Sequence, residues 1–563
     1  MRLRKGFASP DYFGIVDLVQ RFGWFALITL ELLILSALIL ATRCANYPDI
    51  FVGGNVYFTD ADCYSRMTRV GLCAEHPGLI VRHHDFENFP QGTTPHTTAP
   101  LDYLILGLSA LLRPFTAQSL DLAGALISPL FALLGGWFLW WWSGRMRFRY
   151  PWVLLVLYAI SPILVHGTEL GRPDHQSLLM LLVMVAICAE WSLRSEPTAG
   201  WGVTSGIAWG LALWVSAYEP LVLLIVLLAC HAVDPIRTGG WRRRRLSGQD
   251  QPDSGAATAK NRRIGWIVFS AVVAIALLVE RRLPSLSIFS AGEILKNWSR
   301  TIGELQSISL LNPIWFRWAG YMIVLTPILI WMAWSKIKIM GKSASNGAPG
   351  FTIVLLLTTF GLTIWQARWA YFFMSLFAIA LPKLLELIES RVAVWIAFAI
   401  SLLPILRDWD ERLWPNESVL AARIEHRNES VLLRDLAVTI QSDETHAFLA
   451  PWWLSPSIAY WSRQPGLAGS SHESLDGIVD SARFFLAEDS GEAREVLLKH
   501  RMSWVFAYDW DRVARNSAAI LGVAVPARPL CRVIDRTPSQ APSYFLFSSQ
   551  NGIGKLFRVG NKR

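Results

Sequence analysis

Residues 22–42 read FGWFALITLELLILSALILAT, an apolar run long enough to cross a bilayer as one helix. Four basic residues precede this run, namely Arg2, Arg4, Lys5 and Arg21. The run lacks the small-residue cleavage site of a removed signal peptide, so we interpret it as a retained anchor. Because basic residues favour the cytoplasmic side of a span, we expect the N-terminus in the cytoplasm.

The rest of the chain repeats this apolar pattern. Of its 563 residues, 53% are hydrophobic, only 17% are charged and 27 are tryptophan, a composition that excludes an ordinary soluble globule. Further spans fit near 122–143, 151–167, 177–194, 202–217, 220–234, 264–281, 313–335, 350–365, 369–388 and 392–407. We therefore predict a polytopic α-helical membrane protein with about 11–13 transmembrane helices.

Basic residues in the gaps between spans indicate the orientation. They fall in alternate gaps: Arg145, Arg147 and Arg149; Arg194; Arg242 to Arg245 with Arg262 and Arg263; Lys336, Lys338 and Lys342; and Arg391. These gaps are cytoplasmic by the positive-inside rule, so the net charge of +9 reflects topology and predicts no nucleic-acid partner. The same parity requires the short apolar stretch 100–113 to be an interfacial or re-entrant helix.

Two domains follow from this topology. Residues 1–407 form a transmembrane domain with large outer loops 43–121 and 282–312, and 234–263 reads as a mobile cytoplasmic linker. Residues 408–563 carry strand-like and helical patterns, which predict an extracytoplasmic mixed α/β domain on a protein of the bacterial inner membrane. Cys63 and Cys73 form either a bridge in the outer loop or two partly buried thiols.

Four polar clusters fall in loops expected to face the same outer compartment. Their members are Asp60, Asp62, Tyr64 and Arg66 in the first; Glu169, Arg172, Asp174, His175 and Gln176 in the second; Thr301 to Glu304 in the third; and Gln366 to Arg368 in the fourth. All four clusters are therefore expected to face the same compartment.

The chemistry that these clusters fit is the departure of a lipid-linked diphosphate. Its negative charge requires a divalent cation and a fixed guanidinium. Asp60 or Asp62 together with Asp174 are hard ligands for Mg²⁺ or Mn²⁺, and Arg368 lies between two spans where it can clamp the diphosphate.

Each of these residues also has a purely structural interpretation. Asp60 and Asp174 occur where helix caps are common, and an arginine at a membrane boundary often serves as an anchor. Glu304 by itself is only an exposed loop acid. The joint occurrence of these residues on one face favours the functional interpretation.

The order of these motifs resembles the catalytic subunit family of oligosaccharyltransferases, including the single-subunit bacterial and archaeal enzymes. The resemblance covers nearly the whole chain. Its most specific pieces are Thr301-Ile302-Gly303-Glu304, Ala450-Pro451-Trp452-Trp453, Tyr460-Trp461, Arg463-Gln464-Pro465 and Ser481-Ala482-Arg483-Phe484-Phe485. It implies a membrane C-type glycosyltransferase fold that moves a glycan from a polyprenyl-diphosphate carrier to an acceptor outside the cytoplasm.

The resemblance also implies roles for residues. Asp60 or Asp62 and Glu304 would hold the acceptor amide, and Arg368 would hold the diphosphate. The expected metal ligands are Asp60, Asp62 and Asp174, with His175 and Gln176 as further candidates for Mn²⁺ or Mg²⁺. The expected substrate-binding residues, besides Arg368, are Tyr64, Arg66, Thr301, Trp452 and Trp453.

The sequence departs from the family pattern at two places. Gln176 stands at the third position of the second acidic motif, where the family has a charged or imidazole ligand. Leu454 stands where the family has the aspartate that accepts a hydrogen bond from the sequon Ser or Thr. Losing that acceptor costs roughly 1–3 kcal/mol of discrimination, which argues against reading an Asn-x-Ser/Thr sequon.

Three functions remain open from the sequence. The first is transfer of a lipid-linked glycan to protein asparagine, which the motif around Glu304 favours. The second is transfer to a lipid or polysaccharide acceptor, which Leu454 favours. The third, a transporter, is the weakest because the acids cluster at one surface and the sequence shows no internal repeat.

Overall fold

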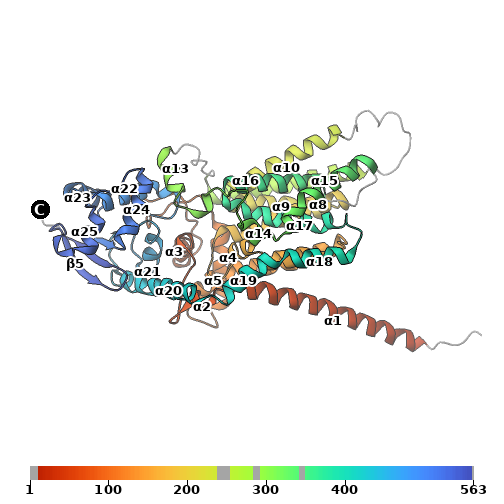
Figure 1. Ribbon diagram of the computed structural model, residues 1–563, viewed down its shortest axis with the longest axis horizontal. Helices are drawn as coiled ribbons and strands as arrows, with labels where there is room; N and C mark the ends of the chain where they lie inside the picture. The colour runs from red at the N-terminus through yellow and green to blue at the C-terminus, as the bar shows by residue number, and fades with distance from the viewer. Residues whose placement is uncertain (1–9, 238–253, 283–291, 341–348, 561–563) are drawn as a thin grey trace, which may run out of the picture.

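The computed structural model describes residues 10–237, 254–282, 292–340 and 349–560. Figure 1 shows an elongated molecule with a bundle of long helices at one end and a smaller mixed domain, formed by the C-terminal part of the chain, at the other. Several residues of the orientation argument lie outside the described ranges: Arg2, Arg4, Lys5, Arg242 to Arg245 and Lys342.

The helix bundle contains most of the predicted spans. Its helices are α1 (Pro10–Arg43), α5 (Ser119–Arg145), α6 (Pro151–Ile160), α7 (Pro162–His166), α8 (His175–Ser195), α9 (Ala199–Val215), α10 (Tyr218–Arg237), α12 (Ser254–Glu280), α14 (Ile314–Ala319), α15 (Met322–Met340), α16 (Gly350–Trp365), α17 (Ala370–Leu385), α18 (Arg391–Ser401) and α19 (Leu403–Leu413). Among the described residues, six helices are long and apolar enough to cross a membrane, and five are shorter and apolar. A polytopic helical membrane protein is therefore confirmed.

Two predicted spans are wrong in detail because each is interrupted. The span 151–167 breaks at Ser161, since Pro162 has no backbone N–H and pushes the preceding residue into extended backbone. The span 313–335 breaks at Gly320, whose φ of +68° suits glycine, and where a Cβ would lie 2.3 Å from the Ser401 carbonyl oxygen. The predicted span 392–407 lies within Arg391–Leu413, one of the six candidate membrane spans, although Leu402 separates α18 from α19 there.

Burial separates the central helix from the peripheral ones. In α17, 89% of the most apolar window is buried, whereas the value is 17% in both α1 and α12. An all-round apolar helix at the centre and two exposed apolar helices at the edge are the arrangement expected of a bundle surrounded by lipid. Helix α17 packs against α6, α8 and α16, and it brings its N-terminal end to the face of the bundle that meets the mixed domain.

Helices α9 and α12 pack through glycine. A Cβ on Gly206 would lie 2.2 Å from the carbonyl oxygen of Gly265, and one on Gly202 would lie 2.2 Å from that of Asn261. Small residues let membrane helices approach closely enough for backbone contact, so this seam fixes α12 against the bundle. The predicted linker 234–263 is too long at both ends, because α10 runs to Arg237 and α12 begins at Ser254; its central part, 238–253, lies outside the described residues.

Short elements lie between the bundle and the mixed domain (Figure 1). They are α2 (Tyr47–Ile50), β1 (Phe51–Val52), β2 (Asn55–Val56), α3 (Ala61–Glu75), α4 (Ala99–Leu112), α13 (Glu293–Ser299), and the 3-10 turns η2 (Gly303–Leu305) and η4 (Ala367–Trp369). Helix α4 packs on α5, and its 14 residues span about 21 Å, less than the roughly 30 Å hydrocarbon core. It stays a predicted interfacial helix.

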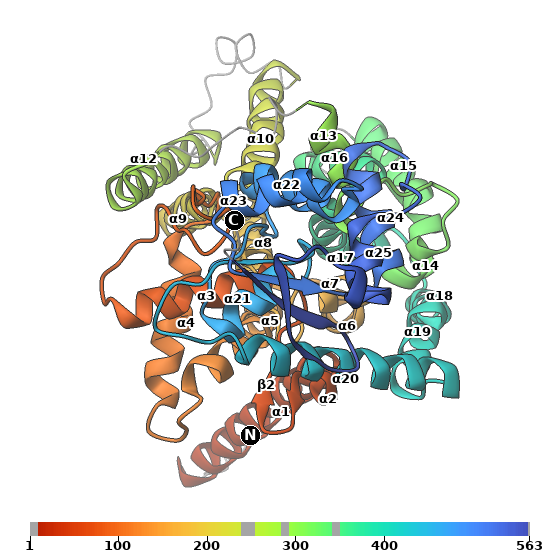
Figure 2. The same ribbon diagram turned by 90° about the vertical axis from the view of Figure 1, so that its left-hand side faces the viewer.

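The C-terminal domain is mixed α/β. It contains α20 (Glu417–Val438), β3 (Phe448–Leu449), α21 (Ser455–Ser462), η5 (His472–Ser474), α22 (Leu475–Leu486), α23 (Ser490–Lys499), β4 (Trp504–Ala507), α24 (Trp510–Leu521), α25 (Leu530–Arg536), η6 (Pro538–Gln540), β5 (Phe545–Gln550) and β6 (Lys555–Val559). The strands form one sheet in the order β3-β4-β6-β5, in which only the β3–β4 pairing is parallel. Figure 2 views this end of the molecule and shows the domain lying over the bundle. The expected boundary at residue 408 falls inside α19, so the change from bundle to domain comes a few residues later.

Candidate functional site

Arg172 is the centre of the polar clusters. Its Nη1 lies 3.1 Å from Oδ2 of Asp60, and its Nη2 donates to Oε1 of Glu304 at 3.0 Å. The guanidinium is only 6% exposed, and it also approaches Glu169 at 3.8 Å. The facing carboxylates of Asp60 and Glu304 overcome the effect of burial and hold the pKa of Arg172 well above its usual value. Three predicted outer loops therefore meet at one buried charge.

The first acidic motif begins α3. Asp60 is the N-cap of this helix, and its Oδ1 accepts a hydrogen bond from the backbone N–H of Cys63 at 3.0 Å. The structural interpretation of Asp60 as a cap is thus confirmed, although its second oxygen faces Arg172. Asp62 lies in the first turn, with its side chain exposed toward a cavity. Loss of solvation among the surrounding side chains, together with the negative charges of Asp60 and Asp174, raises the pKa of Asp62 to about 8.

The second acidic motif begins α8. Asp174 occupies the N-cap position, yet its side chain makes no cap hydrogen bond and instead lies 2.6 Å from Nδ1 of His175. Burial opposes ionisation, but His175 and Arg172 outweigh it and hold the pKa of the Asp174 carboxyl well below its usual range. Gln176 is buried and donates to Glu219 at 3.4 Å. This hydrogen bond turns Gln176 toward α10.

The two motifs share one cavity. Its volume is about 60 Å³, and its lining includes Asp62, Arg66, His96, Asp174, His175 and Ser470. A space of this size holds one or two water molecules. The lining comes from the first outer loop, the start of α8 and the C-terminal domain, so the cavity forms only when all three assemble.

Arg368 lies at the N-terminal end of α17. Its Nη2 is 2.5 Å from Oε1 of Glu219, a fully buried carboxylate at the start of α10, and its guanidinium carbon lies 5.7 Å from the ring centre of Tyr218. The Nε atom of Arg368 is buried and has no hydrogen-bond partner among the described residues. Arg368 is therefore oriented by Glu219 and keeps donor capacity for a ligand.

The turn that carries Glu304 is held from two sides. From the bundle, the Tyr371 hydroxyl donates to Glu304 Oε1 at 2.9 Å. From the C-terminal domain, the ring of Trp452 contacts Trp298 of α13 with centroids 5.7 Å apart, and Trp452 itself donates to Asn516. Thr301 closes the intervening turn by donating its hydroxyl to the Trp298 carbonyl at 2.7 Å.

Three predicted substrate-binding residues have structural partners in this conformation. Tyr64 is 7% exposed, and its ring packs at 5.3 Å from that of Phe58 and 5.6 Å from that of Tyr460. Arg66 borders the cavity but is paired with Asp102 at 2.8 Å. Trp453 packs against the domain core beneath Arg512. The structure does not bring Tyr64 and Trp453 to the cavity lining.

Leu454 is a packing residue. Its side chain contacts two apolar clusters of the C-terminal domain, on either side of the sheet strand β3. The neighbouring Ser455 is 1% exposed, and its hydroxyl faces the carbonyl oxygens of Ala450 and Pro451 at 3.3 and 3.2 Å. All six cysteines, each in the described part of the chain, are free thiols, so a Cys63–Cys73 bridge is wrong for this structure.

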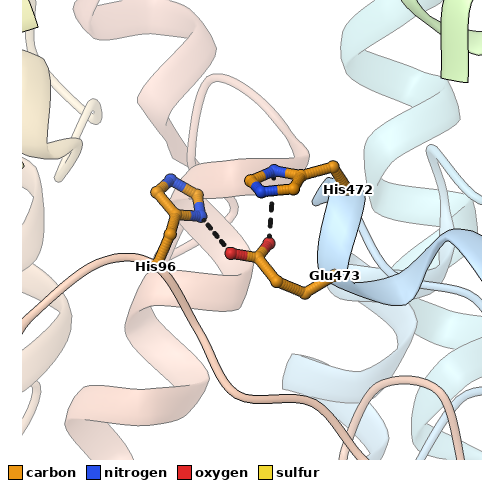
Figure 3. Close-up of side chains that lie close together, drawn as sticks. All are labelled: His96, His472 and Glu473. Atoms are coloured by element: carbon orange, nitrogen blue, oxygen red, sulfur yellow. Dashed lines mark hydrogen bonds and ion pairs between the residues drawn. The ribbon is translucent and has the colours of Figure 1, made fainter. Parts of the chain in front are cut away.

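Sequence reasoning missed several residues around the site. Glu219 lies in a two-residue outer gap between predicted spans, and the criterion that selected the other acids would have found it. His96, His472 and Glu473 meet across the first outer loop and the C-terminal domain (Figure 3), and their spacing in the sequence gives no signal. Tyr371 was hidden because it falls inside an apolar span.

Asp62 and Asp174 supply carboxylate oxygens to the cavity, and the buried Nε2 atom of His175 has no hydrogen-bond partner within the described ranges. Groups of this kind can bind a divalent cation. In this conformation, however, the ligand atoms of these three residues do not all lie within 4.8 Å of one another. Asp60 and Glu304 both contact the Arg172 guanidinium, so in this conformation an organic cation balances their charge.

Comparison with known proteins supports the fold but not a closer relationship. No protein-family model matches the sequence, and a comparison with curated proteins finds no match either. Among solved structures, the oligosaccharyltransferase of Archaeoglobus fulgidus tethered to an acceptor peptide with an NVT sequon has a TM-score of 0.61 at 15% identity, over 93% of this chain and 73% of that chain. The same organism's AglB, in complex with an inhibitory peptide and a dolichol-phosphate, has a TM-score of 0.60 at 15% identity, with the same coverage.

A second kind of enzyme has a similar architecture. ArnT from Cupriavidus metallidurans, bound to undecaprenyl phosphate, has a TM-score of 0.53 at 12% identity, over 95% of this chain and 98% of that chain. Both neighbours are membrane C-type glycosyltransferases. With the helical bundle, the extended outer loops and the C-terminal domain described above, this chain has the fold of a membrane C-type glycosyltransferase.

Proposed function

We propose that the chain transfers a glycan from a polyprenyl-diphosphate carrier to an acceptor on the extracytoplasmic face of the membrane. One observation carries the proposal: carboxylates from three separate outer segments converge where the helix bundle meets the C-terminal domain. Asp60 and Glu304 contact Arg172, and Asp62 and Asp174 line one cavity.

The neighbours support the carrier class. The A. fulgidus enzyme was solved with a dolichol-phosphate and the C. metallidurans enzyme with undecaprenyl phosphate, both phosphorylated polyprenyl lipids. In this chain Arg368 is the diphosphate-binding residue, because its guanidinium is fixed by Glu219 and retains an unpaired Nε. A bidentate arginine fork matches phosphate oxygens better than a lysine does.

We infer that Asp62, Asp174 and His175 hold a divalent cation, Mn²⁺ or Mg²⁺, with Asp60 as a further ligand. When bound, the cation supplies positive charge near the leaving diphosphate. Asp62 and Glu304 orient the acceptor. The Trp452–Trp298 contact positions the turn that carries Glu304.

Two acceptor classes have support. The sequence Thr301 to Glu304 and the peptide-bound A. fulgidus structure favour protein asparagine, which is the first candidate. The packing of Leu454 into the domain core favours a lipid or polysaccharide hydroxyl, because no carboxylate stands there to accept a sequon hydroxyl.

The test is transfer with purified full-length protein. A lipid-diphosphate-linked glycan and Mn²⁺ are mixed with an Asn-x-Thr peptide, the same peptide with glutamine in place of asparagine, or a glycolipid acceptor, and the products are identified by mass spectrometry. We expect one acceptor to gain the glycan, and Asp62→Asn to abolish the gain. Asp85→Asn, an exposed carboxylate in the same outer loop, is the matched control and should keep full activity. Unchanged transfer by Asp62→Asn, or no transfer to any acceptor, would contradict the proposal.

A further inference from the structure

A second group of metal-ligating side chains lies beside the acidic cavity. Figure 3 shows the imidazoles of His96 and His472 both turned toward the carboxylate of Glu473. His96 Nδ1 lies 2.8 Å from Glu473 Oε1, and His472 Nδ1 lies 3.4 Å from Oε2. One ligand atom from each residue lies within 4.8 Å of the other two. Across the described ranges, this is the only set of three or more such residues that meets this distance.

The three residues come from distant parts of the chain. His96 belongs to the first outer loop, whereas His472 and Glu473 begin the short turn η5 of the C-terminal domain. The two segments already dock through backbone hydrogen bonds, from Phe89 N–H to the Gly466 carbonyl at 3.2 Å and from Gly466 N–H to the Phe86 carbonyl at 2.9 Å. The histidine cluster therefore sits on a preformed junction and is not a chance approach of mobile side chains.

The hydrogen bonds within the cluster leave coordination capacity. Glu473 is 9% exposed, and its Oε2 is buried without a hydrogen-bond partner in the described part of the chain. Two imidazoles and one carboxylate therefore present three possible metal ligands to one point. In a tetrahedral zinc site, bonds of roughly 2.0–2.2 Å place ligand atoms about 3.4 Å apart, close to the separation of His472 from Glu473.

We infer that His96, His472 and Glu473 bind a second divalent cation of the zinc class, distinct from the Mn²⁺ or Mg²⁺ of the acidic cavity. Two imidazoles and one carboxylate are a donor set that zinc favours, whereas Mg²⁺ and Mn²⁺ favour oxygen. Three protein ligands leave a fourth position for water. The ion fastens the first outer loop to the C-terminal domain, and this role does not depend on the proposed transfer reaction.

The position of this site gives it a second consequence. His96 lines the cavity that contains Asp62 and Asp174, and its ring centre is 5.8 Å from that of His175. An ion that holds His96 therefore also fixes one wall of the acidic cavity. His96, His472 and Glu473 are positioning residues in this respect, because they act on the cavity through the loop.

The experiment measures zinc directly. Full-length protein is stripped with chelator, re-equilibrated with Zn²⁺ alone, desalted, and analysed for bound metal by mass spectrometry. We expect the wild type to bind one zinc per chain more than the cluster variants, with the affinity of this site at least about 100-fold weaker in His96→Ala, His472→Ala and the isosteric Glu473→Gln. His83→Ala in the same outer loop and His426→Ala on α20, both exposed histidines, are the controls and should retain zinc.

Two further readouts separate this site from the acidic cavity. Co²⁺ in place of zinc should give the visible absorption of a four-coordinate ion, and Glu473→Gln should remove it while Asp62→Asn and Asp174→Asn leave it intact. Hydrogen exchange of residues 84–98 should slow when zinc is added to the wild type and stay unchanged in Glu473→Gln, which retains the backbone docking. Equal zinc retention in the cluster variants and the wild type would overturn the inference, and so would equal loss in Asp62→Asn.

Discussion

Asp62 and Asp174 line one cavity, yet their pKa values are shifted in opposite directions. Asp62 borders other carboxylates and Asp174 contacts His175, so the first resists ionisation and the second favours it. A pair of titratable groups driven apart in this way is a common mark of an active site. The same contrast makes their effects on stability opposite in sign.

For Asp62, the folded protein retains a proton up to about pH 8, whereas the unfolded chain releases it near pH 4. Folding therefore takes up a proton in this range, and the stabilising contribution present at low pH is lost as pH rises to 8. In chelator, Asp62→Asn should raise the melting temperature above pH 8, with little effect near pH 4. Asp174→Asn should lower the melting temperature at pH 7. The pKa of Asp174 is lower in the folded protein than in the unfolded chain, so its ionised carboxylate stabilises the fold at any pH above the unfolded pKa. Differential scanning fluorimetry in detergent measures both, and a matching sign for the two variants would refute this assignment.

Arg368 combines a structural ion pair with the proposed phosphate contact. Arg368→Ala leaves the fully buried Glu219 unpaired, a change that costs about 3–5 kcal/mol of stability. The double variant Arg368→Ala, Glu219→Gln removes that charge and should recover the melting temperature, but not the binding of a lipid diphosphate. Arg368→Lys should keep partial binding. Binding is measured by titration with the lipid, and normal binding by the double variant would exclude Arg368 as the clamp.

At the level of elements, the loop segment 293–305 is held in place by the C-terminal domain. Helix α13 packs against α24, and Trp298 lies in an apolar cluster with residues of α22 and α24. The turn η2 that follows is tied to the bundle through Glu304. The same short segment therefore contacts both domains.

Loosening the 293–305 segment should slow glycan transfer without weakening the binding of the donor lipid. Trp452→Ala removes the ring contact with Trp298, worth about 1.4 kcal/mol, and should lower kcat about tenfold while donor affinity is unchanged. Hydrogen exchange of residues 293–305 should rise in parallel. Trp414→Ala, a tryptophan that is 73% exposed, is the control and should change neither quantity. A reduced donor affinity in Trp452→Ala would show instead that Trp452 acts on the lipid.

The seam between α9 and α12 makes a different prediction. Gly206→Ala places a methyl group 2.2 Å from a carbonyl oxygen of α12, so the helices must separate, at a cost of about 1–3 kcal/mol. Gly361→Ala, in α16, meets nothing within 4 Å and serves as the matched control. Thermal unfolding should show a loss for Gly206→Ala alone, and equal melting temperatures would contradict the close approach.

On the scale of the whole molecule, the sequence predicts the class of architecture better than the positions where individual helices are interrupted. Hydropathy located the helices of the bundle because burial in lipid demands long apolar segments. Hydropathy did not mark the breaks at Ser161 and Gly320. The first follows from Pro162, a local signal that hydropathy ignores, whereas the second depends on the close approach of Gly320 to Ser401, which only the tertiary structure shows. Hydropathy also missed the helical start of α12, which begins at Ser254 in a polar stretch.

The candidate site was predictable to a similar degree. Charged residues stand out in an apolar sequence, so Asp62, Asp174, Glu304 and Arg368 could be identified as candidates. The sequence indicated that they face the same compartment, but not the role of Arg172, whose contacts with Asp60 and Glu304 join loops far apart in the chain. The cluster of His96, His472 and Glu473 was hidden for the same reason, because two domains contribute to it.

The predicted orientation leads to a whole-molecule test. If the N-terminus is cytoplasmic and the C-terminal domain is outside, a reporter enzyme that folds only outside the cytoplasm should be active when fused after Gly560. The same reporter fused after Arg147, in a basic gap, should be inactive. Activity is assayed in intact cells at matched expression. The reverse pattern would place the acidic cavity on the cytoplasmic side.

The grip of the C-terminal domain on the 293–305 segment limits how this protein can be recombined. An engineer who exchanges the C-terminal domain for that of a distant relative would keep a resident α13 whose Trp298 no longer meets its own Trp452. A working chimaera must therefore take the loop segment 293–305 from the same relative as the new domain. The same contact constrains evolution of the sequence. A substitution of Trp298 is expected to require a compensating change at Trp452, although more than 150 positions separate the two in the chain.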